Sequence, residues 1–321
     1  MIDEFKRWLV HSYKRTSEQG WEGASKSAFQ LYKGLWRFGT HLPIGTNVYE
    51  YDWDVLIVLD GCRVDLMREV SDEYDFIESV DTICSVGSHS IEWIEQTFTQ
   101  NYLSEINETI YVTANPHSDA IGIDTSELRE VDEVWRYGFD DNLGTIPPQV
   151  VTDRAIRADR THRPEWLVVH YMQPHQPFIT AERERFRQLS LVDAVEEDDR
   201  GWLPGDVGRN NVWRRYRRGE LAYEEVWDPY KDTLRMVLDD VEVLLDTLGT
   251  RTVAITADHG NAIGEWKMYG HTHGFVHPSV RRVPWVETTG RDASDYEPAL
   301  WIDNEESSSV GDVLEALGYV E

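Results

Sequence analysis

The chain contains continuous apolar runs that alternate with segments in which apolar residues recur at helical spacing. Four runs predict buried strands, at 55–60, 109–115, 165–172 and 252–260. Helical spacing predicts helices at 90–104, 151–159, 228–248 and 308–317. Continuous apolar strands separated by helices are typical of parallel sheets that are covered on both faces. We therefore expect an α/β fold with a mostly parallel central sheet and helices on both sides.

The pattern divides the chain into two parts. Residues 1–50 predict a basic amphipathic helical segment, and residues 51–321 predict one α/β domain. Within that domain the alternation stops at about 180–225, where the chain is polar and charged. Long irregular insertions in compact domains are usually lids or binding loops, so a lid-like insertion is expected there.

The first forty residues carry seven basic and four acidic side chains, and they include four of the six lysines in the chain. Basic amphipathic helices can lie on anionic membrane surfaces. They can equally pack on the main domain as a brace, because an apolar helix face is commonly part of a core. Peripheral membrane contact through residues 1–40 and a structural brace are both open at this point.

The charge of the whole chain is strongly negative. Acidic residues outnumber basic ones by 59 to 31, which gives a formal charge of −28. Such a surface repels itself at low salt, and it suits a cytoplasm near molar salt, where the Debye length is about 3 Å. A halophilic source is therefore expected, with an acidic mesophilic protein as the alternative. The same charge argues against nucleic acid as a partner.

The sequence also predicts a cellular location. Cys62 and Cys84 are the only cysteines, so there is no disulfide framework. No segment reaches the roughly 18 apolar residues of a membrane span, and the N-terminus lacks the pattern of a signal peptide. These features predict a cytoplasmic protein, with membrane contact at most peripheral.

Residues that commonly bind metals follow the predicted strands. Asp60 follows the first run, His175 follows the third, and Asp258 and His259 follow the fourth. Ligands of parallel sheets bind beyond the carboxyl ends of the strands. Each residue alone has an ordinary explanation, such as a helix cap or a packed histidine. Together, carboxylates and imidazoles at one edge would repel and desolvate one another without a cation, and this ligand type favours Mn²⁺ or Zn²⁺ over Ca²⁺.

A candidate nucleophile lies in the segment TICSVGSHSIEWIEQTF, residues 82–98. It places Cys84, Ser85, Ser88 and Ser90 just before a predicted helix. Backbone N–H groups at a helix start favour an anion there, and a nearby metal ion lowers the pKa of a hydroxyl. The alternative is that Ser88 is only the cap of the helix.

These motifs together resemble the alkaline phosphatase/sulfatase superfamily. VLIVLDGCRVDLM is similar to the first metal-binding aspartate motif, especially its nucleotide pyrophosphatase/phosphodiesterase form. HYMQPHQPF resembles the sulfatase-type substrate loop, and TADHGNAIGEW resembles the Asp-His-Gly metal motif. A Gly-His pair at 270–271, an Arg-Val-Pro at 282–284 and the closing VLEALGYVE fit the same order. The resemblance covers residues 51–321.

The resemblance implies roles for particular residues. Asp60, Asp258 and His259 would hold a divalent metal ion that Ser88 or its neighbour also touches. His175 and His271 would contact the transferred anionic group or its leaving oxygen. The reaction would be in-line displacement at phosphorus or sulfur through a covalent serine intermediate, which water or an acceptor alcohol resolves.

The chain departs from the superfamily pattern at several positions. Cys84 lacks the proline and arginine that a sulfatase needs to convert its cysteine. No Asp-x-x-x-His supplies a second metal site, so one ion is expected unless the histidines at 271–277 build another. Asn261 stands where the superfamily has glutamate. Ser88 is the expected nucleophile, with Ser85 as the alternative.

The sequence thus predicts a metal-dependent hydrolase or transferase acting on a phosphate ester. The alternatives are a sulfate-ester hydrolase, a mutase-type isomerase, and a degenerate member that binds a ligand without catalysis. The substrate is expected to be an anionic ester, either a small molecule or one linked to a lipid or glycan.

Overall fold

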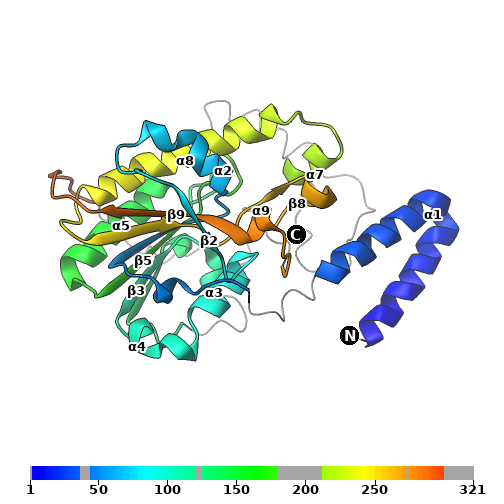
Figure 1. The fold of residues 1–321 in the computed structure, drawn as a ribbon, viewed down its shortest axis with the longest axis horizontal. Helices are drawn as coiled ribbons and strands as arrows, with labels where there is room; N and C mark the ends of the chain where they lie inside the picture. The colour runs from blue at the N-terminus through cyan, green and yellow to red at the C-terminus, as the bar shows by residue number, and fades with distance from the viewer. Residues whose placement is uncertain (1, 37–43, 120–124, 180–211, 272, 300–321) are drawn as a thin grey trace.

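The computed structural model describes residues 2–36, 44–119, 125–179, 212–271 and 273–299. Its main sheet has seven strands in the order β2-β9-β6-β1-β5-β3-β4 (Figure 1). The bounds are Val55–Leu59 (β1), Asp81–Cys84 (β2), Thr109–Thr113 (β3), Glu130–Glu133 (β4), Trp166–Tyr171 (β5), Thr252–Thr256 (β6) and Arg282–Thr289 (β9). Strands β6, β1, β5, β3 and β4 are parallel, whereas β9 is antiparallel to both β6 and β2. The mostly parallel sheet predicted from the sequence is confirmed.

Helices cover both faces of this sheet (Figure 1). The α-helices of the main domain are Val64–Val70 (α2), Ser90–Thr97 (α3), Leu103–Ile106 (α4), Pro148–His162 (α5), Val212–Arg217 (α7), Glu224–Leu245 (α8) and Pro278–Arg281 (α9). Single 3₁₀ turns are Val48–Glu50, Ser71–Glu73, Gln100–Tyr102, Pro116–Asp119, Val134–Arg136 and Glu265–Lys267. A small second sheet pairs Ala262–Ile263 (β7) with Tyr269–Gly270 (β8).

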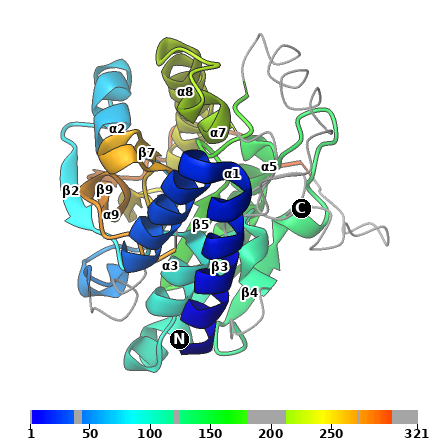
Figure 2. The same ribbon diagram turned by 90° about the vertical axis from the view of Figure 1, so that its right-hand side faces the viewer.

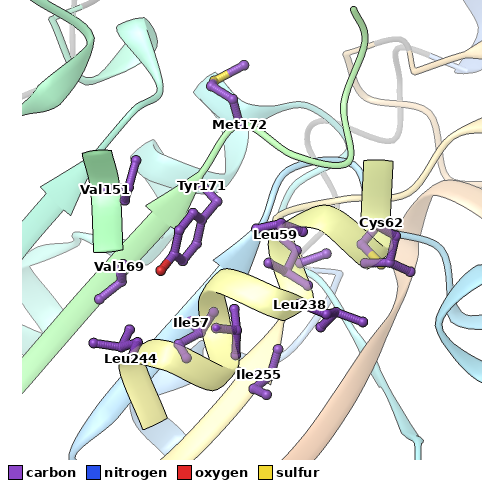
Figure 3. Close-up of a cluster of buried hydrophobic side chains, with 14 of the residues drawn as sticks. Ile57, Leu59, Cys62, Val151, Val169, Tyr171, Met172, Leu238, Leu244 and Ile255 are labelled. Carbon is purple, nitrogen blue, oxygen red and sulfur yellow. The ribbon is translucent and has the colours of Figure 1, made fainter. Parts of the chain in front are cut away.

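The strand period of two divides the core between the two faces of the sheet. On one face Ile57 and Leu59 pack against α5 and α8, and Figure 3 shows Leu238 and Leu244 of α8 over these strands. On the other face Leu56 and Val58 belong to a second cluster, with side chains of α3 and α4. Because β1 is covered on both sides, all five of its residues are fully buried. That burial explains why its sequence is continuously apolar rather than alternating.

Several predicted elements differ from the observed ones. The helix expected at 90–104 is interrupted, and it consists of α3, a 3₁₀ turn and α4. Strands β2, β4 and β9 were not predicted. Strands β2 and β4 are only four residues long and part-exposed, so neither has a continuous apolar run. Strand β9 contains Pro284, which interrupts the pattern expected of a strand. The expected helix at 308–317 and the 180–211 part of the expected insertion lie outside the described residues.

The N-terminal segment forms helix α1, Ile2–Trp36, which bends at Gly20. Its C-terminal half reaches the main domain at Tyr32, whose hydroxyl donates to the carbonyl oxygen of Trp266 at 3.1 Å. Tyr32 also packs against the small apolar cluster that includes Met268 and Phe275. Among the described residues, no helix combines the length and the apolar character needed to cross a membrane.

Candidate active site

The predicted carboxylates meet at the carboxyl edge of the central strands. Asp60 follows β1 and Asp258 follows β6, and these strands are parallel neighbours. His170, in β5 on the other side of β1, points to the same place. One ligand atom from each of the three residues lies within 4.8 Å of the others, and all three side chains are fully buried. Parallel pairing therefore brings together residues that are far apart in the chain.

His259 completes a group of four. Its Nε2 lies 3.6 Å from Asp60 Oδ1 and 3.4 Å from Asp258 Oδ2. Its Nδ1 lies 3.0 Å from the carbonyl oxygen of Gly260, which orients the ring so that Nε2 faces the two carboxylates. The three predicted metal residues, Asp60, Asp258 and His259, are thus side by side, together with His170.

The chemistry of this group fits a divalent cation. Asp258 Oδ1 accepts hydrogen bonds from the backbone N–H groups of Gly61 (2.9 Å) and His259 (2.8 Å). Its Oδ2, like Nε2 of His170, is buried and has no hydrogen-bond partner among the described residues. Leaving buried polar atoms unpaired is costly, and a cation between the carboxylates would remove that cost.

The electrostatics of the group are consistent with this fit. Burial raises the pKa of Asp258, but the nearby imidazoles, chiefly that of His259, together with hydrogen bonds from Gly61 N–H and Ser90, lower it overall, so the carboxylate is favoured. Burial lowers the pKa of His170 to about 4, which keeps its imidazole neutral. His170 Nδ1 lies 2.8 Å from the Tyr111 hydroxyl. When Nδ1–H donates to that oxygen, the Nε2 lone pair is available as a ligand.

Asp60 is held by two side chains from other elements. Its Oδ2 accepts a hydrogen bond from Asn115 Nδ2 at 2.8 Å and one from Ser90 Oγ at 3.3 Å. Asn115 lies two residues after the end of β3, so it belongs to the same set of strand-end residues. It was not predicted, although its place at the end of the run at 109–115 was a signal that could have identified it.

The serine beside the carboxylates is Ser90, the first residue of α3. Its Oγ lies 3.3 Å from Asp60 Oδ2 and 3.4 Å from His259 Nε2, and the side chain is fully buried. Ser88, the expected nucleophile, donates its hydroxyl to Glu92 Oε2 at 2.7 Å. Ser85, the alternative, donates to the carbonyl oxygen of Asp258. The hydroxyls of Ser88 and Ser85 therefore support the loop, and that of Ser90 borders Asp60 and His259.

Both histidines expected to contact the transferred group lie next to this cluster. The ring centroid of His271 is 4.2 Å from that of His259 and 5.2 Å from that of His175. Two further imidazoles, those of His89 and His117, were not predicted; the His89 centroid is 4.9 Å from His271 and 5.1 Å from His117. Burial lowers the pKa of His175 to about 4 and that of His117 to about 3, and it lowers the pKa values of His89 and His271 well below 6.5. The site is therefore bordered by neutral imidazoles.

A buried arginine fixes the two loops that carry the carboxylates. Arg63 donates to both carboxylate oxygens of Asp65 at 2.8 and 2.6 Å, to the Asn261 carbonyl oxygen at 2.5 Å and to Glu265 at 2.8 Å. The Asp60–Gly61 turn also depends on close packing. Gly61 has a φ of +69°, and a Cβ there would lie 2.8 Å from Asn261 Nδ2. The loop after β1 is thus tied to the loop after β6.

The mostly parallel sheet covered by helices is the fold that the superfamily resemblance implies. No family model matches the chain, and no curated protein matches it. Solved structures that are similar to this chain include phosphoethanolamine transferases and sulfatases.

Three of these structures illustrate the degree of similarity in sequence and fold. The soluble domain of lipooligosaccharide phosphoethanolamine transferase A from Neisseria meningitidis is 14% identical, with 74% of this chain and 75% of that chain covered and a TM-score of 0.48. The C-terminal periplasmic domain of EptC from Escherichia coli, in complex with zinc, is 10% identical, with 78% and 77% covered and a TM-score of 0.43. The 2-O GAG sulfatase BT1596 is 13% identical, with 77% and 65% covered and a TM-score of 0.44.

The comparison contradicts the expected location. The sequence predicted a cytoplasmic protein, whereas the similar structures include domains described as periplasmic, from Escherichia coli and from Campylobacter jejuni. The cytoplasmic prediction is therefore wrong on this comparison. It rested on the lack of a signal-peptide pattern and a membrane span, which are absences and give no positive evidence of a compartment.

Proposed function

We propose that the protein is a metal-dependent enzyme acting on a phosphate ester. It transfers the phosphoryl group, or a substituted phosphoryl group, through a covalent intermediate on Ser90. The observation that carries the proposal is the position of the Ser90 hydroxyl, at a helix start and within 3.4 Å of both Asp60 and His259. This assignment replaces the expected Ser88, whose hydroxyl donates to Glu92.

The metal ligands in this proposal are Asp60, Asp258 and His259, with His170 as a further ligand from the other side of β1. Two carboxylates and imidazole nitrogen suit Zn²⁺ or Mn²⁺. When bound, the cation supplies positive charge that favours the deprotonated form of a nearby hydroxyl and offsets the charge of the transferred group. We propose one ion for this ligand set.

The remaining chemistry belongs to the side chains of the protein. The Ser90 O–H bond breaks, a bond forms between Oγ and phosphorus, and the bond from phosphorus to the ester oxygen breaks. The leaving oxygen takes up a proton. His271 and His175, whose rings lie next to each other and beside His259, are proposed to accept the Ser90 proton and to return a proton to the leaving oxygen. In the second half of the reaction, water or an acceptor alcohol attacks the same phosphorus and releases Ser90.

A phosphate ester is favoured over a sulfate ester by the identity of the residue at the site. The side chain beside the carboxylates is a serine. Cys84, the residue that a sulfatase-type reaction would have to modify, lies in the edge strand β2, where it pairs with Arg282 of β9. The proposed substrate is an anionic phosphate ester, either a small molecule or one carried on a lipid or glycan.

The test compares serine variants of the full chain. With Zn²⁺ or Mn²⁺ and an aryl phosphate monoester or diester, Ser90→Ala is expected to lower kcat by about three orders of magnitude or more. Ser88→Ala is the matched control and is expected to keep most of the turnover. Mass spectrometry of the quenched wild-type reaction should locate the added group on the peptide that contains Ser90.

Metal analysis separates the two parts of the proposal. Asp258→Asn is expected to lose the bound ion, whereas Ser90→Ala is expected to keep it. Full activity of Ser90→Ala would refute the covalent step. Absence of stoichiometric metal in an active wild-type protein would refute the proposed cofactor. Turnover of an aryl sulfate alone would shift the assignment to sulfate esters.

A further inference from the structure

Helix α1 is folded back on itself, and most of the described residues on its inner face are small or polar. The bend is at Gly20, which has a φ of +59°, and Figures 1 and 2 both show the two halves of α1 side by side. The halves are in close contact, because a Cβ added at Gly23 would lie 2.3 Å from the carbonyl oxygen of Arg15. The part-buried residues of the first half share one face at a spacing of three or four: Trp8, Ser12, Arg15 and Gln19. Three of these four are polar, and among the residues of the second half whose burial is described, Gly23 and Ser27 are buried.

The outer face of the first half carries exposed apolar side chains flanked by lysines. Leu9, Val10 and Tyr13 are 47%, 69% and 79% exposed. With Lys6 and Lys14 they follow i, i+3, i+4, i+7 and i+8 spacing, which places all five on one side of the helix. We call these five residues the outward stripe. Trp21, immediately after the bend, is 87% exposed.

This arrangement is the reverse of an ordinary helical hairpin. A hairpin in water packs its apolar side chains inside and exposes its polar ones. Here the described contact between the halves uses Trp8 with small and polar residues, whereas Leu9, Val10 and Tyr13 face outward. An exposed contiguous apolar surface commonly marks a binding site.

The charge of α1 identifies the kind of surface that it fits. The helix holds six of the 31 basic residues and four of the 59 acidic residues, so its formal charge is +2 in a chain whose total is −28. An anionic surface therefore attracts α1 and repels the rest of the molecule. A contact with such a surface would therefore be made through α1.

We propose that the outward stripe and Trp21 dock on an anionic lipid surface, with α1 lying in the plane of the headgroups. Leu9 and Val10 enter the acyl boundary, while the rings of Tyr13 and Trp21 lie at headgroup level with their polar atoms toward water. Lys6 and Lys14 extend their ammonium groups to lipid phosphates while their methylene stems cover apolar area. The binding does not depend on turnover, so it stands or fails separately from the proposed reaction.

Docking in this way would hold the candidate active site near the lipid. Tyr32 of α1 contacts the segment that contains His271: its hydroxyl donates to the Trp266 carbonyl oxygen, and its ring packs against the cluster of Met268 and Phe275. This extension rests on the proposed function. It places a lipid-linked phosphate ester among the substrates that the site could reach.

Vesicle flotation of the full chain tests the proposal. The protein is expected to float with vesicles of phosphatidylglycerol and phosphatidylcholine in equal parts, and to remain unbound with phosphatidylcholine alone. Tyr13→Asp and Val10→Asp are each expected to lower the vesicle partition coefficient by about tenfold or more, because each replaces an apolar contact by a charge.

His11→Asp is the matched control, since His11 is exposed on the same helix but lies outside the outward stripe. It introduces the same aspartate and is expected to retain binding within about threefold, as a surface charge change should. Thermal unfolding of the variants, measured alongside, is expected to be unchanged because the substituted side chains are exposed.

Three outcomes would overturn the proposal. The wild-type chain could fail to float with anionic vesicles. The stripe variants and His11→Asp could lose binding equally, which would indicate charge attraction without a docking face. Sedimentation could show a wild-type dimer that Tyr13→Asp converts to a monomer, without vesicle binding, which would assign the stripe to a second copy of the chain.

Discussion

Single buried residues hold the Ser90 loop in place. Arg281 donates to Glu92 Oε1 at 2.6 Å and to the Val86 carbonyl oxygen at 2.7 Å. Glu92 Oε2 accepts from the backbone N–H (2.9 Å) and the hydroxyl (2.7 Å) of Ser88. Burial raises the pKa of Glu92, but Arg281 and the Ser88 hydrogen bonds outweigh burial and lower it. The ion pair thus links α3, the loop before it and α9.

Removing one partner of this pair is expected to be strongly destabilising. Glu92→Gln should lower the free energy of unfolding at pH 7 by about 3–5 kcal/mol, because the buried Arg281 charge loses its counterion. A lowered folded-state pKa means that Glu92 stabilises the protein above its unfolded pKa, and that this contribution is lost as the pH falls through the folded value. The difference between variant and wild type should therefore shrink at acidic pH in urea unfolding. Glu95→Gln, on the exposed side of α3, is the control and should change the free energy of unfolding by less than about 0.5 kcal/mol. Equal stabilities of Glu92→Gln and wild type at pH 7 would contradict the prediction.

At the scale of elements, α5 and α8 pack against each other and place acidic residues near one another. Asp153 of α5 is fully buried and accepts a hydrogen bond from the Tyr296 hydroxyl at 2.8 Å. Asp240 of α8 is part-buried; burial, together with the charges of Asp153 and Asp239, raises its pKa to about 7. The two helices are held by apolar contacts such as those of Val151, Leu238 and Leu244 (Figure 3). Charged acids between the helices oppose that packing.

The raised pKa of Asp240 predicts that its charged form lowers the stability of the folded protein at alkaline pH. A group whose pKa is higher in the folded state stabilises the protein most below its unfolded pKa, near 4, and loses that contribution as the pH rises through about 7. Asp240→Asn should therefore melt at a higher temperature than wild type at pH 8, and its free energy of unfolding should be about 1–3 kcal/mol larger. This difference in stability should disappear near pH 4. Asp228→Asn, which removes only an exposed ion pair with Lys231 on the same helix, should show no such pH dependence. A gain for Asp240→Asn that is the same at pH 4 and pH 8 would refute the stated cause.

At the scale of the whole molecule, the excess of acidic residues is the dominant electrostatic feature. The formal charge of −28 is spread over a chain in which exposed ion pairs, such as Arg235–Glu73 and Arg291–Asp246, contribute little individually. Salt weakens those pairs, and it also screens the repulsion among the excess acids. Because the acids outnumber the bases almost two to one, repulsion is the larger effect. The expectation of a halophilic source depends on the same balance.

Stability is therefore predicted to increase with ionic strength. Raising KCl from about 0.05 M to about 1 M shortens the Debye length from more than 10 Å to about 3 Å, and the melting temperature should rise over this range. The rise should be steepest at the low end, where screening changes most. Sucrose at matched osmolality is the control, because it stabilises by exclusion without screening charge. A melting temperature that is flat or falling with KCl would show that the surface ion pairs outweigh the net repulsion.

The sequence by itself determined the features that depend on neighbours along the chain. The four core strands were predicted because a strand covered on both faces must be continuously apolar. Asp60, Asp258 and His259 could be predicted as candidate ligands because each lies within three residues of the end of such a strand, and parallel strands end at a common edge. The basic, amphipathic character of α1 was visible from spacing and charge alone.

Only the tertiary structure decided which side chains face one another. His170 lies inside an apolar run, and its position at the site depends on the pairing of β5 with β1. Ser88 and Ser90 are two residues apart, and the orientation of α3 directs the second toward Asp60 and the first toward Glu92. Strands β2 and β9 exist through their pairing with each other and with β6, which no local pattern encodes. For α1, periodicity indicated an amphipathic helix. Only the close approach of Gly23 to the backbone of Arg15 shows that the face carrying Arg15 packs against the second half of the helix. Periodicity and adjacency are local properties of a sequence, whereas strand register, helix phase and the choice of a packing face are fixed by partners distant in the chain.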